Sequence, residues 1–154
     1  DVLGLADIEK QKLKLLCEFH DIGEIAIPSK ILQKKGFLNK DEWERIKSHS
    51  EIGYHIIAAS RETLVIDELI LMHHERWDGK GYPGLLKNEE IPLTVRIFAI
   101  ADAYEAMVND RPYRERMTNN QALKEIERKA GTQFDPNIAK IFVQIMKKVE
   151  EEAI

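Results

Sequence analysis

The histidines of this chain are concentrated in its first half, at His20, His49, His55, His73 and His74. His20 is followed directly by Asp21, and His73 and His74 are consecutive at the end of an apolar stretch. Adjacent residues of these types at a helix end can direct two side chains toward one metal ion. His55 lies six residues after His49, about 240° around a helix, so we interpret it as a surface residue outside that group.

A carboxylate also falls within an apolar stripe. Asp102 has the helical spacing that places it on one face with Val95, Phe98, Ala99 and Ala106. Such a carboxylate is costly unless something compensates its charge. An ion pair with Arg96 or Arg111 is one solution, and metal coordination is another. Any one of these signals alone is usually structural, but their joint occurrence favours a metal site.

The residue types indicate which metals and which reaction to expect. Imidazole with carboxylate suits Fe, Mn or Zn, whereas Mg and Ca prefer oxygen ligands alone. Six candidate ligands exceed the need of one tetrahedral ion, so we predict two ions bridged by Asp21; the candidates are His20, Asp21, His49, His73, His74 and Asp102. Two ions roughly 3.5–4 Å apart are the usual means of hydrolysing a phosphodiester. Arg111 and Arg114 supply cations that bind phosphate or a base.

The elements that must position these residues are helices. Apolar residues recur at helical spacing, period-two alternation is nearly absent, and Asn39 with Glu42 and Thr118 with Gln121 resemble helix-capping pairs. We predict an all-α fold of six or seven helices, with an extended piece ending at Pro28. The expected helices cover residues 6–21, 29–34, 40–60, 63–75, 92–109 and 118–129, with a last one from Asp135. Trp43 and Cys17 are expected to be buried.

Composition limits the class of protein. The chain has 154 residues, 44% of them hydrophobic and 32% charged, which fits one globular domain and excludes disordered and low-complexity classes. The net charge of −4 gives no basic field for DNA. One cysteine, no apolar run long enough to span a bilayer and no signal-peptide pattern indicate a soluble cytoplasmic domain.

These motifs together resemble a known family. The His20-Asp21 pair running into Pro28 resembles the HD signature of metal-dependent phosphohydrolases. The string His73–Pro83 (HHERWDGKGYP) is similar to the longer and more specific signature of the HD-GYP subfamily. Further similar segments follow in the expected order: Lys47–His49, Ala101-Asp102, Asp110–Arg114 and Gly131–Pro136. The similarity covers nearly the whole chain, which we interpret as one HD-GYP domain over residues 1–154 with an HD-type helical bundle.

The resemblance implies a bacterial enzyme that hydrolyses cyclic di-GMP to pGpG, GMP or both, with two divalent ions. Fe or Mn is expected first, with Zn, Ni or Mg as alternatives. The six candidate ligands match the family's metal ligands, and Arg111 and Arg114 match positions that contact the dinucleotide. Lys80 and Tyr82 are expected to bind substrate as well. The Gly81–Pro83 loop is a candidate surface for a cyclase domain or another signalling protein, and a homodimer is a further candidate assembly.

Two departures from the family pattern leave alternatives open. Glu24 occupies a position where the family usually has a lysine near the substrate phosphate. We therefore assign Glu24, with Asp21, to the catalytic group, either orienting a ligand or serving a different substrate. The family also draws a ligand from a helix before the HD helix, and we expect that helix to be lacking here. The alternative is a degenerate module that binds cyclic di-GMP or a signalling partner without efficient hydrolysis. A general HD nucleotide phosphohydrolase would leave the GYP segment unexplained.

Overall fold

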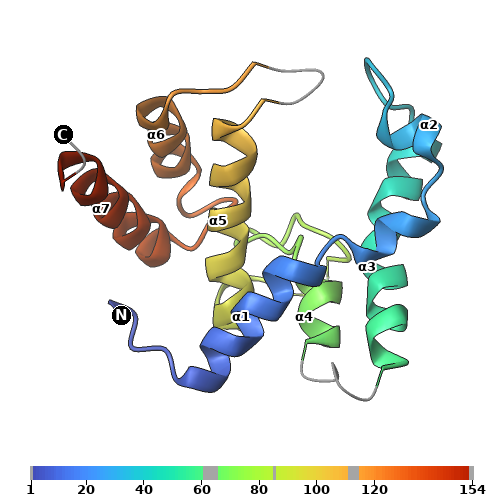
Figure 1. Cartoon of the computed structure of the whole chain (residues 1–154), viewed down its shortest axis with the longest axis horizontal. Coiled ribbons are helices and arrows are strands. Elements are labelled where there is room, and N and C mark those ends of the chain that lie inside the picture. Colours follow the sequence, from blue (N-terminus) through green and yellow to red (C-terminus); the bar gives the residue numbers. More distant parts are fainter. Residues whose placement is uncertain (1, 61–65, 85, 111–114, 153–154) are drawn as a thin grey trace. The chain divides into compact units, whose positions relative to one another are not determined.

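The structure, a computed structural model, describes residues 2–60, 66–84, 86–110 and 115–152. Within those ranges it contains seven α-helices, two short 3-10 helices and no β-strand, which confirms the expected all-α fold (Figure 1). The α-helices are α1 (Asp7–Phe19), α2 (Ser29–Leu32), α3 (Lys40–Ala58), α4 (Asp67–Met72), α5 (Leu93–Val108), α6 (Asn119–Lys129) and α7 (Pro136–Glu152). The 3-10 helices are η1 (Ile22–Ala26) and η2 (Asn88–Glu90). None of the described helices is both long enough and apolar enough to cross a membrane.

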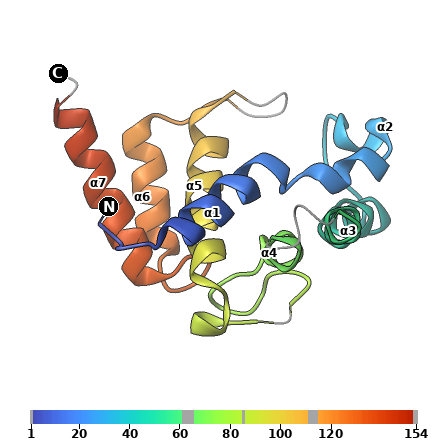
Figure 2. The ribbon, with the colours of Figure 1, turned by 60° about the horizontal axis from the view of Figure 1, so that its bottom comes forward.

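The helices divide into two compact units, Asp1–His74 and Glu75–Ile154. In the first unit α3 is the central element, because η1, α2 and α4 all pack against it, and α1 contacts α4 (Figure 2). A capping box starts α3 where the sequence predicts it: the Asn39 side chain accepts from the amide of Glu42, and the Glu42 side chain accepts from the amide of Asn39. Lys34 adds an ion pair to Glu42 at 2.6 Å, which ties the segment after α2 to α3.

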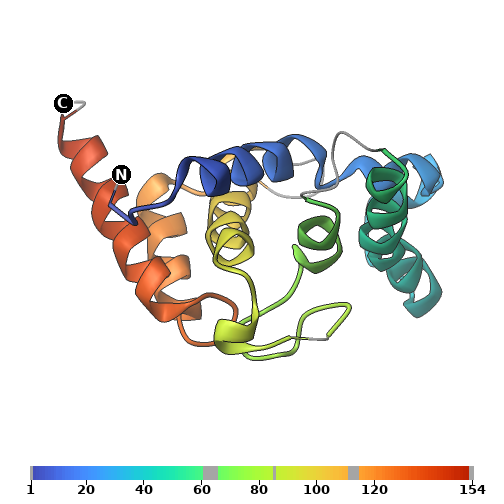
Figure 3. The same cartoon turned by 90° about the horizontal axis from the view of Figure 1, so that it is seen from below.

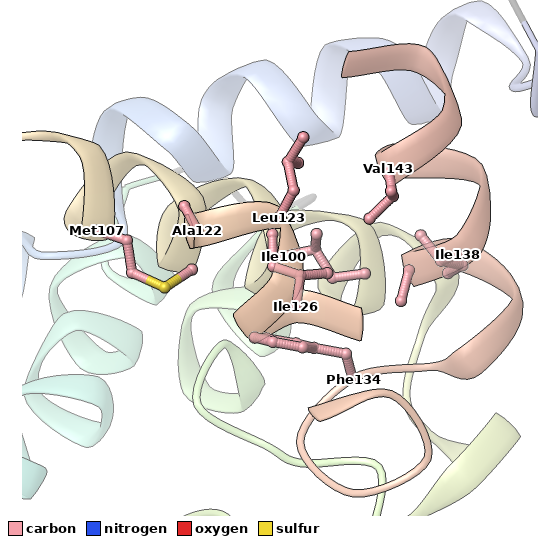
Figure 4. Close-up of a cluster of buried hydrophobic side chains, with 9 residues drawn as sticks. Ile100, Met107, Ala122, Leu123, Ile126, Phe134, Ile138 and Val143 are labelled. Carbon is pink, nitrogen blue, oxygen red and sulfur yellow. The ribbon is translucent and has the colours of Figure 1, made fainter. Parts of the chain in front are cut away.

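The second unit contains α5, α6 and α7, which lie side by side in Figures 1 and 3. Thr118 and Gln121 form the predicted capping box at the start of α6. The hydrophobic core of this unit is drawn in Figure 4 and consists of Ile100, Met107, Ala122, Leu123, Ile126, Phe134, Ile138, Ala139 and Val143. On α5, Ile100 and Met107 are seven residues apart and share the face that packs on α6 and α7, whereas Asp102 lies about 200° around the helix from Ile100.

Four local expectations are wrong. The first half of the piece expected to be extended before Pro28 belongs to η1, because the amides of Glu24 and Ile27 donate to the carbonyls of Asp21 and Glu24, and only Ile27 and Pro28 have extended backbone. The helix expected to reach Glu75 ends at Met72, and Glu75 accepts a hydrogen bond from the amide of Gly84 instead. Trp43 is 46% exposed, and Cys17 is exposed as well. Both side chains lie on helix faces that the described part of the chain leaves open to solvent.

Candidate metal centre

Three imidazoles meet inside the first unit. His49 comes from the middle of α3, and His73 and His74 follow the last residue of α4. His49 and His73 are each 2% exposed, and His74 is half-buried. The Nε2 atom of His49 lies 3.2 Å from Nε2 of His73 and 3.2 Å from Nε2 of His74. Among the described residues, these three form a group whose donor atoms are close enough to share one ion.

Hydrogen bonds to the main chain determine which ring nitrogen of these histidines carries the proton. His49 Nδ1 donates to the carbonyl of Ile46 at 2.7 Å, and His73 Nδ1 donates to the carbonyl of Ile70. Each Nε2 atom of this pair therefore presents a lone pair, and the two lone pairs face each other. Two acceptors at that distance repel unless a cation lies between them, so the donor set fits a metal ion.

The spacing also fits. Imidazole nitrogens bind transition metals at about 2.0–2.1 Å. Two nitrogens bound to one ion at tetrahedral or octahedral angles are then roughly 2.8–3.4 Å apart. The 3.2 Å separations of His49 from His73 and from His74 fall within that range. The three side chains thus have the spacing of a ligand set for one ion.

His20 and Asp21 extend the cluster on one side. His20 caps the end of α1, and its Nδ1 donates to the carbonyl of Cys17 at 3.1 Å. The two carboxylate oxygens of Asp21 face different histidines: Oδ2 is 3.1 Å from Nε2 of His20, and Oδ1 is 3.8 Å from Nε2 of His49. Asp21 therefore lies between two histidines, and its role as a bridging ligand stays a prediction.

Close packing at two glycines brings these segments together. A Cβ atom at Gly23 would lie 1.9 Å from the carbonyl oxygen of His49 and 2.7 Å from the amide nitrogen of Gly53. A Cβ atom at Gly53 would lie 2.9 Å from Cγ2 of Ile70. Only the absence of side chains lets η1 approach the backbone of α3 on one side and α4 approach it on another. His49 and Gly53 are four residues apart and share that face of α3.

Burial keeps His73 and His74 neutral. It lowers the pKa of His73 to about 4, with further lowering by the nearby His49 and His20. Burial, with the neighbouring His73 and His49, lowers the pKa of His74 to about 2. Partial burial alone would raise the pKa of Asp21, but the hydrogen bond from His20 and the nearby histidines lower it overall. At neutral pH His73 and His74 are therefore neutral and Asp21 is ionised, which are the forms that bind metal.

The other predicted site residues lie outside the group formed by His49, His73 and His74. Glu24 is half-buried in η1, three residues after Asp21. Asp102, half-buried on α5, and Lys80 and Tyr82, in the segment before α5, belong to the second unit. Their roles stay predictions. Arg111 and Arg114 lie outside the described residues.

The sequence interpretation overlooked two kinds of contributor. The main-chain carbonyls of Cys17, Ile46 and Ile70 orient three imidazoles, each from three residues earlier in the chain. In a helix the carbonyl group three residues before a histidine lies near its ring, so these contacts could have been predicted from the sequence. The partner of Arg96 was also missed: it is Asp135, at 2.7 Å, and not Asp102. No sequence pattern links two residues so far apart in the chain.

Comparison with known proteins agrees with the geometry. Residues 1–138 match the HD domain family. A cyclic di-GMP phosphodiesterase of Thermotoga maritima is 37% identical over 151 residues, which are 97% of this chain and 41% of that protein. A cyclic di-GMP phosphodiesterase response regulator of Xanthomonas campestris pv. campestris is 42% identical over 136 residues, covering 87% of this chain and 36% of that protein. A 3'3'-cGAMP-specific phosphodiesterase of Vibrio cholerae is 37% identical over 143 residues, covering 92% and 27%.

The chain spans less than half the length of each of these relatives. The fold also matches a crystal structure of a cyclic GMP-AMP specific phosphodiesterase of Vibrio cholerae, with a TM-score of 0.72, 20% identity and coverage of 94% of this chain and 40% of that one. The order of the motifs, the helical fold and the histidine cluster agree with these comparisons. The chain belongs to the HD-domain family, in its HD-GYP branch.

Proposed function

We propose that this chain is the hydrolytic domain of a metal-dependent cyclic dinucleotide phosphodiesterase. The observation that carries the proposal is the pair of opposed Nε2 lone pairs, 3.2 Å apart, on the buried His49 and His73. Two buried acceptors that face each other are costly unless a cation lies between them. The names of the relatives, which describe cyclic di-GMP and 3'3'-cGAMP phosphodiesterases, supply the substrate class.

Two metal positions are part of the proposal. His49, His73 and His74 would hold the first ion, and His20 with the second oxygen of Asp21 would hold the other. Asp102, on α5, is the remaining predicted ligand. Bound divalent ions, Fe or Mn in the first place, lower the pKa of a water and neutralise phosphoryl charge. His73 and His74 stay able to bind at pH values well below neutrality, because burial keeps their pKa values low.

Among cyclic dinucleotides we propose cyclic di-GMP as the substrate, with pGpG, GMP or both as the product. Two of the three relatives described above are named for cyclic di-GMP, and they include the one that is 42% identical. The direct comparison is hydrolysis of cyclic di-GMP against 3'3'-cGAMP at equal concentration. A preference for 3'3'-cGAMP would contradict the choice of substrate but leave the reaction class intact.

The reaction class has its own test. Protein purified without oxygen and supplied with Fe(II) or Mn(II) should linearise the dinucleotide, with the product separated by chromatography. Asp21→Asn keeps the size of the side chain but removes the charge that two cation positions need, so turnover should fall by about a thousandfold. His55→Gln is the matched control, because His55 is exposed on α3 outside the cluster. Turnover that survives Asp21→Asn would refute the two-ion proposal.

One residue favours a second candidate function, a module that binds the dinucleotide and hydrolyses it slowly. Glu24 places a carboxylate three residues after Asp21, where a phosphate-binding lysine is usual for the family. An anion there opposes the approach of a doubly anionic substrate. Micromolar binding of cyclic di-GMP with no product over hours would establish this function in place of the first.

A further inference from the structure

The glycine-rich segment of the second unit is fastened to the turn between α6 and α7. The amides of Trp77 and Asp78 donate to the carbonyls of Gln133 and Thr132, at 3.2 and 2.8 Å. The buried carboxylate of Glu75 accepts from the amide of Gly84 at 3.0 Å, which closes residues 75–84 into a loop. We call these residues the glycine loop; in Figure 3 they belong to the segment that leads into α5. Its main chain has a fixed shape, including the part that carries Lys80 and Tyr82.

A buried ion pair lies beside this attachment. Nη1 of Arg96, on α5, donates to Oδ2 of Asp135 at 2.7 Å, and the Asp135 side chain is only 3% exposed. The other oxygen of Asp135 accepts from the amides of Asn137 and Ile138, at 2.8 and 3.3 Å, where α7 begins. The two carboxylate oxygens thus act separately, because Oδ1 caps α7 and Oδ2 holds Arg96.

The held guanidinium also faces the glycine loop. Cζ of Arg96 lies 5.9 Å from the centre of the Trp77 ring, within the range of a cation–π contact. Nε of Arg96 is buried and donates to no acceptor within the described part of the chain. Burying an ion pair yields little net stability, and an unused buried donor reduces it further. What the arrangement supplies is a defined position of Trp77 relative to α5.

We propose that Arg96, held by Asp135, is a positioning residue that sets the glycine loop on α5 in the orientation that binds a cyclic dinucleotide. The inference rests on the proposed function for its substrate. Trp77 lies in the same closed loop as Lys80 and Tyr82. Arg96 lies on the same helix as Asp102. Release of Arg96 therefore loosens the loop without removing a predicted metal ligand or substrate contact.

Asp135→Asn separates the capping of α7 from the contact with Arg96. Asparagine caps a helix about as well as aspartate, so the start of α7 is kept. The amide nitrogen that replaces Oδ2 cannot accept from Arg96. Arg96→Lys is the second variant, because it keeps the positive charge near Asp135 and loses the planar group over Trp77. The matched control is Arg128→Gln, which removes an arginine–carboxylate pair with Glu125 on the exposed surface of α6.

Two substrates distinguish a loss of glycine-loop positioning from general damage to the protein. Cyclic di-GMP needs the glycine loop, whereas the small diester bis(p-nitrophenyl) phosphate needs only the metal centre. We expect Asp135→Asn to raise KM for cyclic di-GMP by about tenfold, with kcat and the small-diester rate within about twofold of wild type. Arg96→Lys should show a smaller rise, and metal content should stay unchanged in both. A parallel fall on both substrates, or no change on either, would overturn the proposal.

The loop position has a readout that needs no catalysis. In a Trp43→Phe background Trp77 is the remaining tryptophan, since the chain has two. Asp135→Asn should roughly double the quenching of its fluorescence by acrylamide, because the ring loses its guanidinium cover. Wild-type protein that hydrolyses no cyclic dinucleotide would refute the proposed function, and the quenching result would then decide the positioning role. Unchanged quenching in both variants means that Arg96 does not hold the loop.

Discussion

Gly23 lies directly against the main chain of His49, so closely that a Cβ atom at Gly23 would be 1.9 Å from the carbonyl oxygen of His49. The contact joins the segment that carries His20 and Asp21 to the helix that carries the central histidine. Because both partners at this point are backbone, neither can move aside by a change of rotamer. The distance between Asp21 and His49 therefore depends on the absence of a side chain at residue 23.

Gly23→Ala should accordingly destabilise the protein and disrupt the metal site. The added methyl group overlaps backbone atoms, so we expect a loss of about 2–4 kcal/mol in the free energy of unfolding. Gly53→Ala should cost less, because its Cβ meets the Ile70 side chain at 2.9 Å and no backbone atom as close. Alanine is also a better helix former than glycine. Urea denaturation measures both variants. Equal stability of Gly23→Ala and wild type would contradict this packing.

Metal binding should stabilise the folded chain. An ion that binds only the folded state at a hundredfold excess over its Kd adds about 3 kcal/mol, which raises Tm by roughly 5–10 °C in a chain of this size. His49→Gln and His73→Gln should each abolish the rise, whereas His55→Gln should keep it. Thermal melts with Mn(II), Fe(II) or Zn(II), before and after chelation, give the answer. A rise that persists in His49→Gln would locate the ion elsewhere.

The metal-free protein should lose stability in mild acid. The pKa of His73 is about 4 in the folded chain against 6.5 for a free histidine, and that of His74 is about 2. The unfolded chain therefore binds more protons than the folded one below pH 6.5, so stability falls as the pH decreases from 6.5 toward 4. Tm should drop by roughly 10–20 °C over that interval. His74→Gln should show a smaller drop, and an equal drop would exclude His74 as a source.

Glu24→Lys tests the departure from the family pattern. Replacing a carboxylate by a cation three residues after Asp21 should favour a doubly anionic substrate, so we expect KM for cyclic di-GMP to fall by about tenfold. Glu51→Lys makes the same charge change at an exposed position of α3 and serves as the control. Steady-state kinetics distinguish the two. A loss of activity in Glu24→Lys would show that the glutamate itself takes part in the reaction.

Helical periodicity and capping pairs were sufficient to predict most of the fold. Asn39 with Glu42 and Thr118 with Gln121 are local signals, and the helices that follow them begin where the sequence predicts. The wrong predictions concern segments whose conformation is determined by tertiary contacts. The segment 22–26 forms η1 against α3, and α4 ends before His73. No capping pair or other local signal in the sequence marks either boundary.

The histidine cluster was predictable in its members but not in its geometry. The sequence brought His49, His73 and His74 forward as candidate ligands by residue type and neighbours, and the structure places their Nε2 atoms together. It could not show that Gly23 and Gly53 permit the approach of the segments, because a glycine in a sequence does not reveal what lies against it. The ion pair of Arg96 with Asp135 is equally a product of the folded chain.

The imidazoles of His20, His49 and His73 are aimed by carbonyl groups of the chain itself, each three residues earlier. Where a carboxylate side chain orients a metal-binding histidine instead, a single substitution can delete it. A carbonyl group survives every amino-acid replacement at its own position. Cys17 and Ile46 can thus change identity while the rings of His20 and His49 keep their direction, whereas Ile70 is also fixed by its packing against Gly53.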